Sequence, residues 1–224
     1  YDWGYTGSLL VEDGRVLVEA GGQDNRSIAA FSANAGELLW SVGNDELGYS
    51  SPISVTLAGR RQAIFFTGYN LLGVAPEHGS ILWQHGWRTD YEANAATPVF
   101  IPPNRFFISS DYGTGGTMVE VSRDNGSFSA HEVWRNRNMK NHMATSIYYE
   151  GHLYGFDSSI LKCLDANTGQ VKWQTRGFKK GTLIIADRHL VVLGEDGNLA
   201  VAKATPAGFS AKAETQVLNS RCWT

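Results

Sequence analysis

The side chains best suited to chemistry gather in the segment 134–142, which carries two arginines, a lysine and a histidine. Arg135 and Arg137 could each offer a planar guanidinium fork to an anionic group, and His142 could offer an imidazole. This combination suits an anionic or carbohydrate-like ligand. The same residues would also serve as a solvent-exposed connection between two structural units, and both interpretations stay open here.

The rest of the chain offers little catalytic or metal-binding chemistry. The six histidines show no paired metal-ligand spacing, and the sequence contains no nucleophile elbow. The glycine-rich run 112–117 lacks the lysine and the helix of a phosphate loop, which favours a hairpin tip. His152 and His189 begin strands at matching places of two repeats, which indicates packing. Cys163 and Cys222 form no metal motif, and we predict that they are buried free thiols.

Composition narrows the class of protein further. The chain has 224 residues, of which 25 are glycine and 12% are aromatic, and this favours turn-rich β structure over helix bundles. A net charge of −3 without a basic run argues against a nucleic-acid partner. No apolar run approaches the roughly 20 residues of a membrane-spanning helix. Because the chain lacks an initiator Met and stops in mid-pattern, we expect an internal piece of a longer protein.

A degenerate motif recurs five times and predicts the elements that must position these side chains. Its best copy, Leu164–Trp173, reads as a strand, a turn built by Asp165, Asn167 and Gly169, and a second strand that carries Trp173. The turn glycines recur at intervals of about 40 to 50 residues, which is typical of propeller blades. They are Gly36, Gly79, Gly126, Gly169 and Gly208. The tryptophans that follow them are Trp40, Trp83, Trp134, which is displaced by four positions, and Trp173.

We therefore predict an all-β chain of four-stranded antiparallel blades, forming a single β-propeller segment of about five consecutive blades. The expected blades span residues 5–43, 48–87, 94–134, 142–177 and 181–218, and 219–224 would start a further blade. Each motif tryptophan should cover a neighbouring blade and donate its indole N–H to a backbone partner, as a tryptophan docking motif. Because an open arc exposes sheet faces, the segment expressed alone should be poorly soluble or self-associate.

The motif Leu164–Trp173 resembles the repeat of the pyrroloquinoline-quinone-like (quinoprotein-like) β-propellers, a family that includes quinone-dependent alcohol dehydrogenases and BamB-type outer-membrane assembly propellers. The resemblance covers all five units. It implies seven or eight blades in the complete protein and a periplasmic or secreted location. Shorter stretches resemble a bacterial branch of quinone-binding-like repeat proteins: Trp3–Tyr5, Tyr112–Gly116, Lys140–His142, Gly151–Asp157 and Ala204–Pro206.

The resemblance also raises the question of a cofactor. The dehydrogenases of this family hold the quinone against a ring made by two adjacent cysteines, with calcium on Glu, Asn and Asp ligands. Here Cys163 and Cys222 are 59 positions apart, and no such trio can be matched. No cofactor and no metal site is therefore evident from the sequence, while pyrroloquinoline quinone with calcium stays an alternative.

In a propeller, the loops before the inner strands converge on the mouth of the central channel. The residues at these places are polar, aromatic and locally cationic, which makes them the candidate ligand-binding groups, with Trp3 and Tyr5 at the equivalent place of the first unit. The candidates are Tyr49, Asn94, Arg135, Arg137, Asn141, His142, Lys180 and Arg221.

Three functions are compatible with these observations. The favoured one is a non-catalytic extracytoplasmic scaffold that binds protein or peptide partners, for which no catalytic residue is assigned. The second is a quinone-dependent oxidoreductase of the alcohol dehydrogenase type. The third is a carbohydrate- or polymer-binding module.

Overall fold

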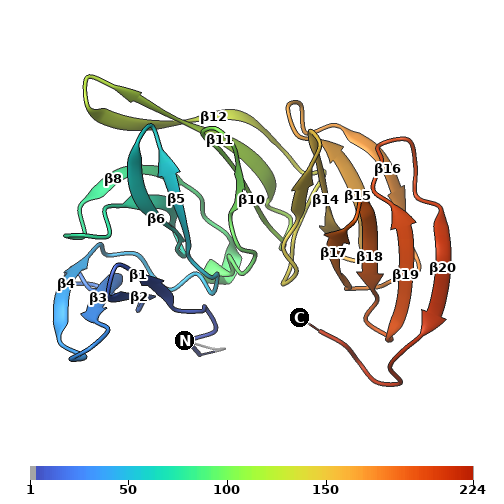
Figure 1. Ribbon diagram of the computed structural model, residues 1–224, viewed down its shortest axis with the longest axis horizontal. Coiled ribbons are helices and arrows are strands. Elements are labelled where there is room, and N and C mark those ends of the chain that lie inside the picture. The colour runs from blue at the N-terminus through green and yellow to red at the C-terminus, as the bar shows by residue number, and fades with distance from the viewer. Residues whose placement is uncertain (1–3, 224) are drawn as a thin grey trace. The chain divides into compact units, whose positions relative to one another are not determined.

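The computed structural model describes residues 4–223, which form five four-stranded antiparallel sheets and one short 3-10 helix, Asp90–Glu92 (Figure 1). In each sheet, strands that are consecutive in the chain pair with one another. Trp3 and Thr224 lie outside the described residues. The strands are β1 (Leu10–Glu12), β2 (Arg15–Glu19), β3 (Ile28–Ser32), β4 (Leu38–Val42), β5 (Ile53–Leu57), β6 (Arg60–Phe66), β7 (Asn70–Val74), β8 (Ile81–Gly86), β9 (Val99–Ile101), β10 (Arg105–Ser110), β11 (Gly115–Asp124), β12 (Ser127–Asn136), β13 (Ile147–Tyr149), β14 (His152–Asp157), β15 (Ile160–Asp165), β16 (Val171–Thr175), β17 (Thr182–Ala186), β18 (His189–Leu193), β19 (Asn198–Lys203) and β20 (Ala211–Gln216).

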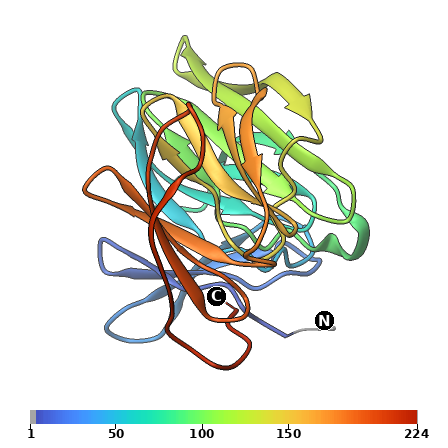
Figure 2. The same ribbon diagram turned by 90° about the vertical axis from the view of Figure 1, so that its right-hand side faces the viewer.

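These sheets confirm the predicted all-β fold of consecutive propeller blades. Each sheet is visibly twisted, as expected from the chirality of extended chains (Figure 2). In four sheets the pairing of the third and fourth strands also shifts register at nearly the same distance before the turn glycine. In the part of the chain that the structure describes, no helix has the length and hydropathy needed to cross a membrane.

The turn of the repeat is stabilised by the Asp165 side chain and by the backbone conformation of Gly169. The Asp165 carboxylate accepts the backbone N–H groups of Asn167 (2.9 Å) and Thr168 (3.1 Å), and so holds the chain in a tight turn. Gly169 has φ +68°, a conformation that costs little only without a Cβ, and its N–H donates to the Asp165 carbonyl at 2.8 Å. The Gly36 and Gly79 turns close with the same backbone bond, which confirms that these segments are one repeated element.

The chain divides into two compact units. One contains the residues up to Ile108 together with Val119–Val133, and the other contains Ser109–Met118 and the chain from Trp134 onward. In the first unit, the apolar run of β6 is buried on both faces: Phe66 packs in one hydrophobic cluster and Phe65 in another. The core of the second unit comes from the sheets β13–β16 and β17–β20.

The two cysteines differ in burial. Cys163 belongs to the core of the second unit and is fully buried, as predicted, and burial raises the pKa of its thiol to about 11. Cys222 is a free thiol too, but it is only half-buried, so the prediction of burial is wrong for this residue. It lies after β20, in a segment without regular structure whose backbone is held by the hydrogen bond from the Cys222 N–H to the Glu195 carbonyl at 2.8 Å.

Three motif tryptophans bind the sheet that follows their own. Each indole N–H donates to the backbone carbonyl of the residue three positions before the turn glycine of that sheet. The three tryptophans therefore make the same hydrogen bond at equivalent positions of the repeat. Because an indole is large and keeps one polar group, this arrangement buries the ring and still satisfies its N–H. The three bonds are Trp40 to Pro76 (3.0 Å), Trp134 to Ala166 (2.9 Å) and Trp173 to Thr205 (2.7 Å).

The third sheet explains the displaced tryptophan. Its strands β11 and β12 have ten residues each and form a longer hairpin, so Trp134 lies eight residues after Gly126 and still reaches the following sheet. Trp83 departs from the pattern, since its indole donates to the Gln62 side chain at 2.7 Å within its own sheet. Trp83 therefore does not make the predicted hydrogen bond to a backbone group of a neighbouring blade.

Candidate functional site

Two asparagines predicted at the channel mouth are buried and act within the fold. Asn94 is fully buried, and its side-chain amide donates to the Thr67 carbonyl at 2.8 Å. Asn141 is 2% exposed, donates to the Phe156 carbonyl at 3.0 Å and accepts a hydrogen bond from Ser146 at 2.9 Å. Each amide fastens the loop before the first strand of a sheet, so neither is presented to a ligand.

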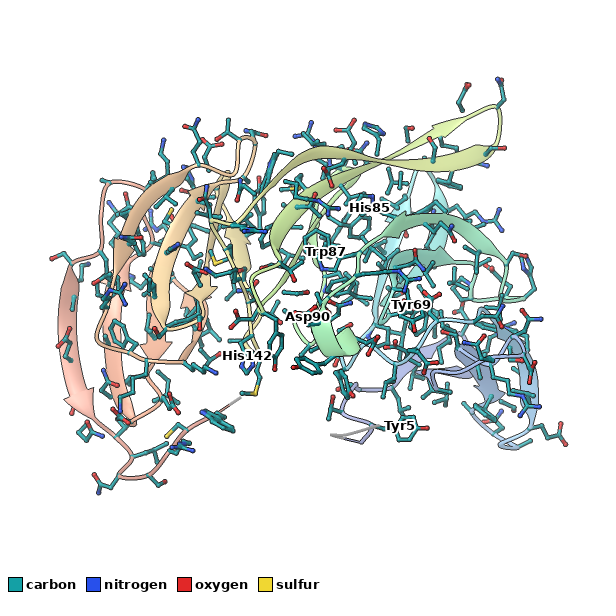
Figure 3. The ribbon with its side chains drawn as sticks, turned by 180° about the vertical axis from the view of Figure 1, so that it is seen from behind. Tyr5, Tyr69, His85, Trp87, Asp90 and His142 are labelled. Carbon is teal, nitrogen blue, oxygen red and sulfur yellow. The ribbon has the colours of Figure 1, made fainter. Side chains whose placement is uncertain are left out.

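Four other aromatic and cationic candidates are not among the residues that line the pocket found in the second unit. Tyr49 is half-buried with φ +78°, and its backbone pairs with that of Asn94 in an isolated bridge. Tyr5 is 67% exposed (Figure 3). Arg135, in β12, and Arg137, just after it, are both exposed. For the arginines, the description as a solvent-exposed connection fits better than a formed binding site.

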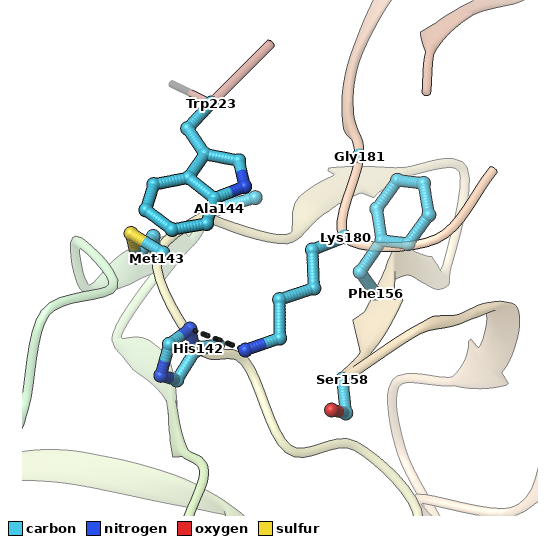
Figure 4. A pocket seen from close by; sticks show the side chains of 8 residues that line it. All are labelled: His142, Met143, Ala144, Phe156, Ser158, Lys180, Gly181 and Trp223. Atoms are coloured by element: carbon cyan, nitrogen blue, oxygen red, sulfur yellow. Dashed lines mark hydrogen bonds between the residues drawn. The ribbon is translucent and has the colours of Figure 1, made fainter. Parts of the chain in front are cut away.

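A pocket in the second unit brings two of the predicted residues together (Figure 4). The pocket is shallow: its enclosed space is about 20 Å³, and the roughly 300 Å³ around it includes open solvent. His142 and Lys180 come from the loops before β13 and β17, and Trp223 comes from the segment after β20. The remaining lining residues are Met143, Ala144, Phe156, Ser158 and Gly181.

A hydrogen-bonded row of three side chains sets the electrostatics of this pocket. The Lys180 Nζ lies 3.4 Å from His142 Nδ1, and His142 Nε2 lies 3.4 Å from the Tyr112 hydroxyl. An ammonium can only donate, so Nδ1 accepts, and Nε2 carries the proton and donates to Tyr112. Burial, and then the charge of Lys180, lower the pKa of His142, while Asp111 acts in the opposite direction. His142 is therefore a neutral imidazole at neutral pH.

Glu195 holds the other wall of the pocket in place. Its carboxylate accepts the Trp223 indole N–H at 2.9 Å and the Lys180 backbone N–H at 3.3 Å, and it pairs with Arg221 at 3.3 Å. The Trp223 hydrogen bond is the main cause that lowers the pKa of this carboxyl. Arg221 also lies over the Trp223 ring, with its guanidinium carbon 5.2 Å from the ring centroid. The structure thus adds Arg221 to the two predicted residues in this region.

Sequence reasoning missed Tyr112, Glu195 and Trp223 as site residues. The glycine-rich run predicts a hairpin tip at Tyr112, and this residue does lie in the turn between β10 and β11, with φ +55°. Glu195 sits between two glycines in a run that indicates only a turn. Trp223 was interpreted as the start of a further blade. In an antiparallel sheet, the turn between the second and third strands lies at the same end as the loop before the first strand, and this topology was the available signal for Tyr112 and Glu195.

The two cysteines do not form the adjacent-cysteine ring of the quinone-binding dehydrogenases. Cys163 is buried in the core of the second unit, while Cys222 is a separate, half-buried free thiol after β20. Within residues 4–223, no group of three His, Cys, Asp or Glu side chains is arranged to hold a metal ion. What the pocket does offer is one ammonium, one neutral imidazole and an apolar wall, which suit the binding of a small anion beside an apolar group.

Comparison with known proteins gives a family match and several structural relatives. Residues 4–175 match the family model described as "Outer membrane protein assembly factor BamB". No curated protein matches the chain. BamB from Moraxella catarrhalis is similar in structure, with a TM-score of 0.51 and 12% identity over 95% of this chain and 76% of that one.

Two further solved structures share the fold at low identity. Apo AztD from Citrobacter koseri has a TM-score of 0.57 and 13% identity, over 96% of this chain and 60% of that one. Quinohemoprotein alcohol dehydrogenase from Comamonas testosteroni has a TM-score of 0.59 and 11% identity, over 96% of this chain and 43% of that one. The present chain therefore spans about half of the length of these two relatives.

Proposed function

Because this chain belongs to the family whose model is described as outer membrane protein assembly factor BamB, we propose that it is part of a non-catalytic extracytoplasmic scaffold that binds protein or peptide partners. The family description supports both the extracytoplasmic location and the class of partner. The tryptophan hydrogen bonds between consecutive sheets serve this role as a docking motif, since they hold the blades as a firm support for the loops.

The observation that carries the proposal is the pocket at His142 and Lys180. A half-buried ammonium beside the Trp223 and Phe156 rings offers a partner both charge and apolar surface. Aromatic side chains such as that of Trp223 are enriched at the centres of protein interfaces, where they supply much of the binding energy. The outer strands of the sheets, such as β16 and β20, also leave one edge unpaired within their sheets, where an extended segment can add as a further strand.

A photo-crosslinking experiment tests the proposed function. A photoreactive amino acid replaces Ser158, which lines the pocket, or Asn125, an exposed residue of the turn between β11 and β12 that serves as the control. The full-length protein is irradiated in cells, and the adducts are identified by mass spectrometry. We expect one defined polypeptide adduct at position 158 and none at position 125. No polypeptide adduct at position 158, at saturating label, would refute the proposal.

Carbohydrate binding is a second candidate, because the Trp223 ring is 53% exposed at the pocket and could stack on a sugar. Its test is titration with neutral oligosaccharides while the Trp223 indole signal is followed by NMR. The quinone-dependent oxidoreductase remains an alternative for the complete protein. It predicts a rise in melting temperature when the full-length protein is given pyrroloquinoline quinone and Ca²⁺.

A further inference from the structure

We propose that the pocket of His142, Lys180 and Trp223 is a subsite for a carboxylate that carries a neighbouring apolar group, presented by a partner segment. This inference rests on the proposed function and names the chemistry that the partner must supply. The carboxylate can come from an Asp or Glu side chain or from a C-terminus, since both present the same anionic group to the pocket.

Lys180 is the charged pocket residue that an incoming anion could pair with. The nearby carboxylates already have other cations: Glu195 pairs with Arg221 (3.3 Å), and Asp196 pairs with Lys179 (2.6 Å). Within the described part of the chain, Lys180 forms no ion pair.

The buried Asp157, next to the lining residue Ser158, is occupied as well. It pairs with Lys140 at 3.0 Å and with Lys162. Asp111 lowers the positive potential near His142, but its carboxylate accepts the backbone N–H of Tyr112 at 2.9 Å. The pocket thus keeps one ammonium whose neighbour is a neutral imidazole, and an incoming carboxylate would supply the missing charge.

The geometry leaves this ammonium able to bind. An ammonium has three donors, and Lys180 directs one of them to His142 Nδ1 at 3.4 Å, so two remain for a carboxylate. The Ser158 hydroxyl lines the same pocket and can add a further donor. Half-burial strengthens such a contact, because a charge that is partly removed from water is screened less.

The apolar lining accounts for the second part of the ligand. The Trp223 indole is held by its hydrogen bond to Glu195 at 2.9 Å, so the ring presents a fixed face. Met143 and Phe156 complete the lining (Figure 4). An apolar side chain next to the carboxylate can pack on these groups, whereas a simple anion such as acetate would use only the charge. The pocket therefore selects a carboxylate with an apolar neighbour.

Four short acetylated peptides test the subsite on the full chain by calorimetry. Two contain an internal Phe-Asp or Phe-Asn and end in an amide, and two end in Phe with a free carboxylate or with an amide. We expect the Phe-Asp peptide, the free-carboxylate peptide or both to bind, and their uncharged counterparts to bind at least 10-fold more weakly. Which charged peptide binds identifies the source of the carboxylate.

Variants at two lysines of the second unit provide the matched control. Lys180→Met should weaken binding by about 10- to 100-fold, as expected for the loss of a charge-assisted hydrogen bond. Lys172→Met should leave binding unchanged, because Lys172 is an exposed residue of β16 that does not line the pocket. Circular dichroism confirms that both variants are folded.

Equal binding of charged and uncharged peptides, no peptide binding, or unchanged binding by Lys180→Met would each overturn the subsite. A polypeptide crosslink at position 158 in such a case would leave the proposed function standing. If the crosslink also failed, both would be refuted.

Discussion

A pair of glycine substitutions tests whether the tryptophan contacts between sheets shape the repeat. Gly36 and Gly79 occupy the same turn position in the first two sheets, with φ +72° and +78°. A Cβ added at Gly79 would lie 2.5 Å from Cε3 of Trp40, whereas one added at Gly36 would meet no atom within 4 Å. Gly79→Ala should therefore destabilise the protein more than Gly36→Ala does.

The expected sizes follow from two separate costs. Placing alanine in the left-handed region costs about 1–2 kcal/mol at either position. At Gly79 the new methyl group must also displace the Trp40 ring, and overpacking of this kind costs about 1–3 kcal/mol. Movement of the ring strains the Trp40 bond to the Pro76 carbonyl (3.0 Å), which adds up to about 1 kcal/mol. We expect Gly79→Ala to exceed Gly36→Ala by about 1–4 kcal/mol.

Urea unfolding of the full chain, followed by circular dichroism, measures both costs. The same two substitutions are then made in a Trp40→Ala background, in which the methyl group at position 79 has room. The excess cost of Gly79→Ala should disappear there, while the cost of Gly36→Ala should stay the same. Equal costs for the two glycines in the native background would show that φ alone requires glycine, and the reasoning about the indole would be refuted.

Three further predictions concern titrating groups. Burial raises the pKa of the Glu19 carboxyl to about 8, so between pH 4.5 and 8 the folded state keeps a proton that the unfolded state, with a pKa near 4.5, has lost. The free energy of unfolding should therefore fall as pH rises through this range. Urea midpoints at pH 5, 6.5 and 8 measure this slope, and Glu19→Gln should flatten it. Native protein should react with a thiol reagent at Cys222 and not at Cys163, whose pKa burial raises to about 11, and labelling of both would contradict this. Lys180→Met should raise the pKa of His142 in an NMR titration, because the lysine charge is the second cause of its lowering, after burial.

The blades could be predicted because the residues that form each strand and turn are close together in the sequence. The strand, turn and strand expected in Leu164–Trp173 are the end of β15, the turn closed by the Gly169 N–H, and β16, Val171–Thr175. A turn glycine and a following tryptophan repeat because each blade needs the same turn. His152 and His189 follow this rule as well, since the Nδ1 atom of each ring contacts the carbonyl of the residue two positions earlier.

The site was less predictable because its contacts are distant in sequence. Asn94 and Asn141 have the polar character of ligand groups, but their partners are the backbone carbonyls of Thr67 and Phe156, which no side-chain pattern reveals. Position in a loop before a first strand was a useful guide to the region. It could not tell an amide that faces the fold from an ammonium that faces a pocket.

A structural contact that recurs in several sheets can be distinguished from a contact that occurs in one sheet. Ser50 and Asn141 each donate to a backbone carbonyl in the second strand of their own sheet, that of Phe66 (3.1 Å) and that of Phe156 (3.0 Å), so a side chain before a first strand has the same structural task in two sheets. In the fifth sheet the corresponding loop carries Lys180, which makes no such backbone bond and directs its ammonium to His142 instead. A loop that leaves the structural pattern of its repeat while the blade beneath it keeps the fold is free to serve binding. The departure at Lys180, rather than the cationic run at Arg135, is therefore the stronger indication of a functional site.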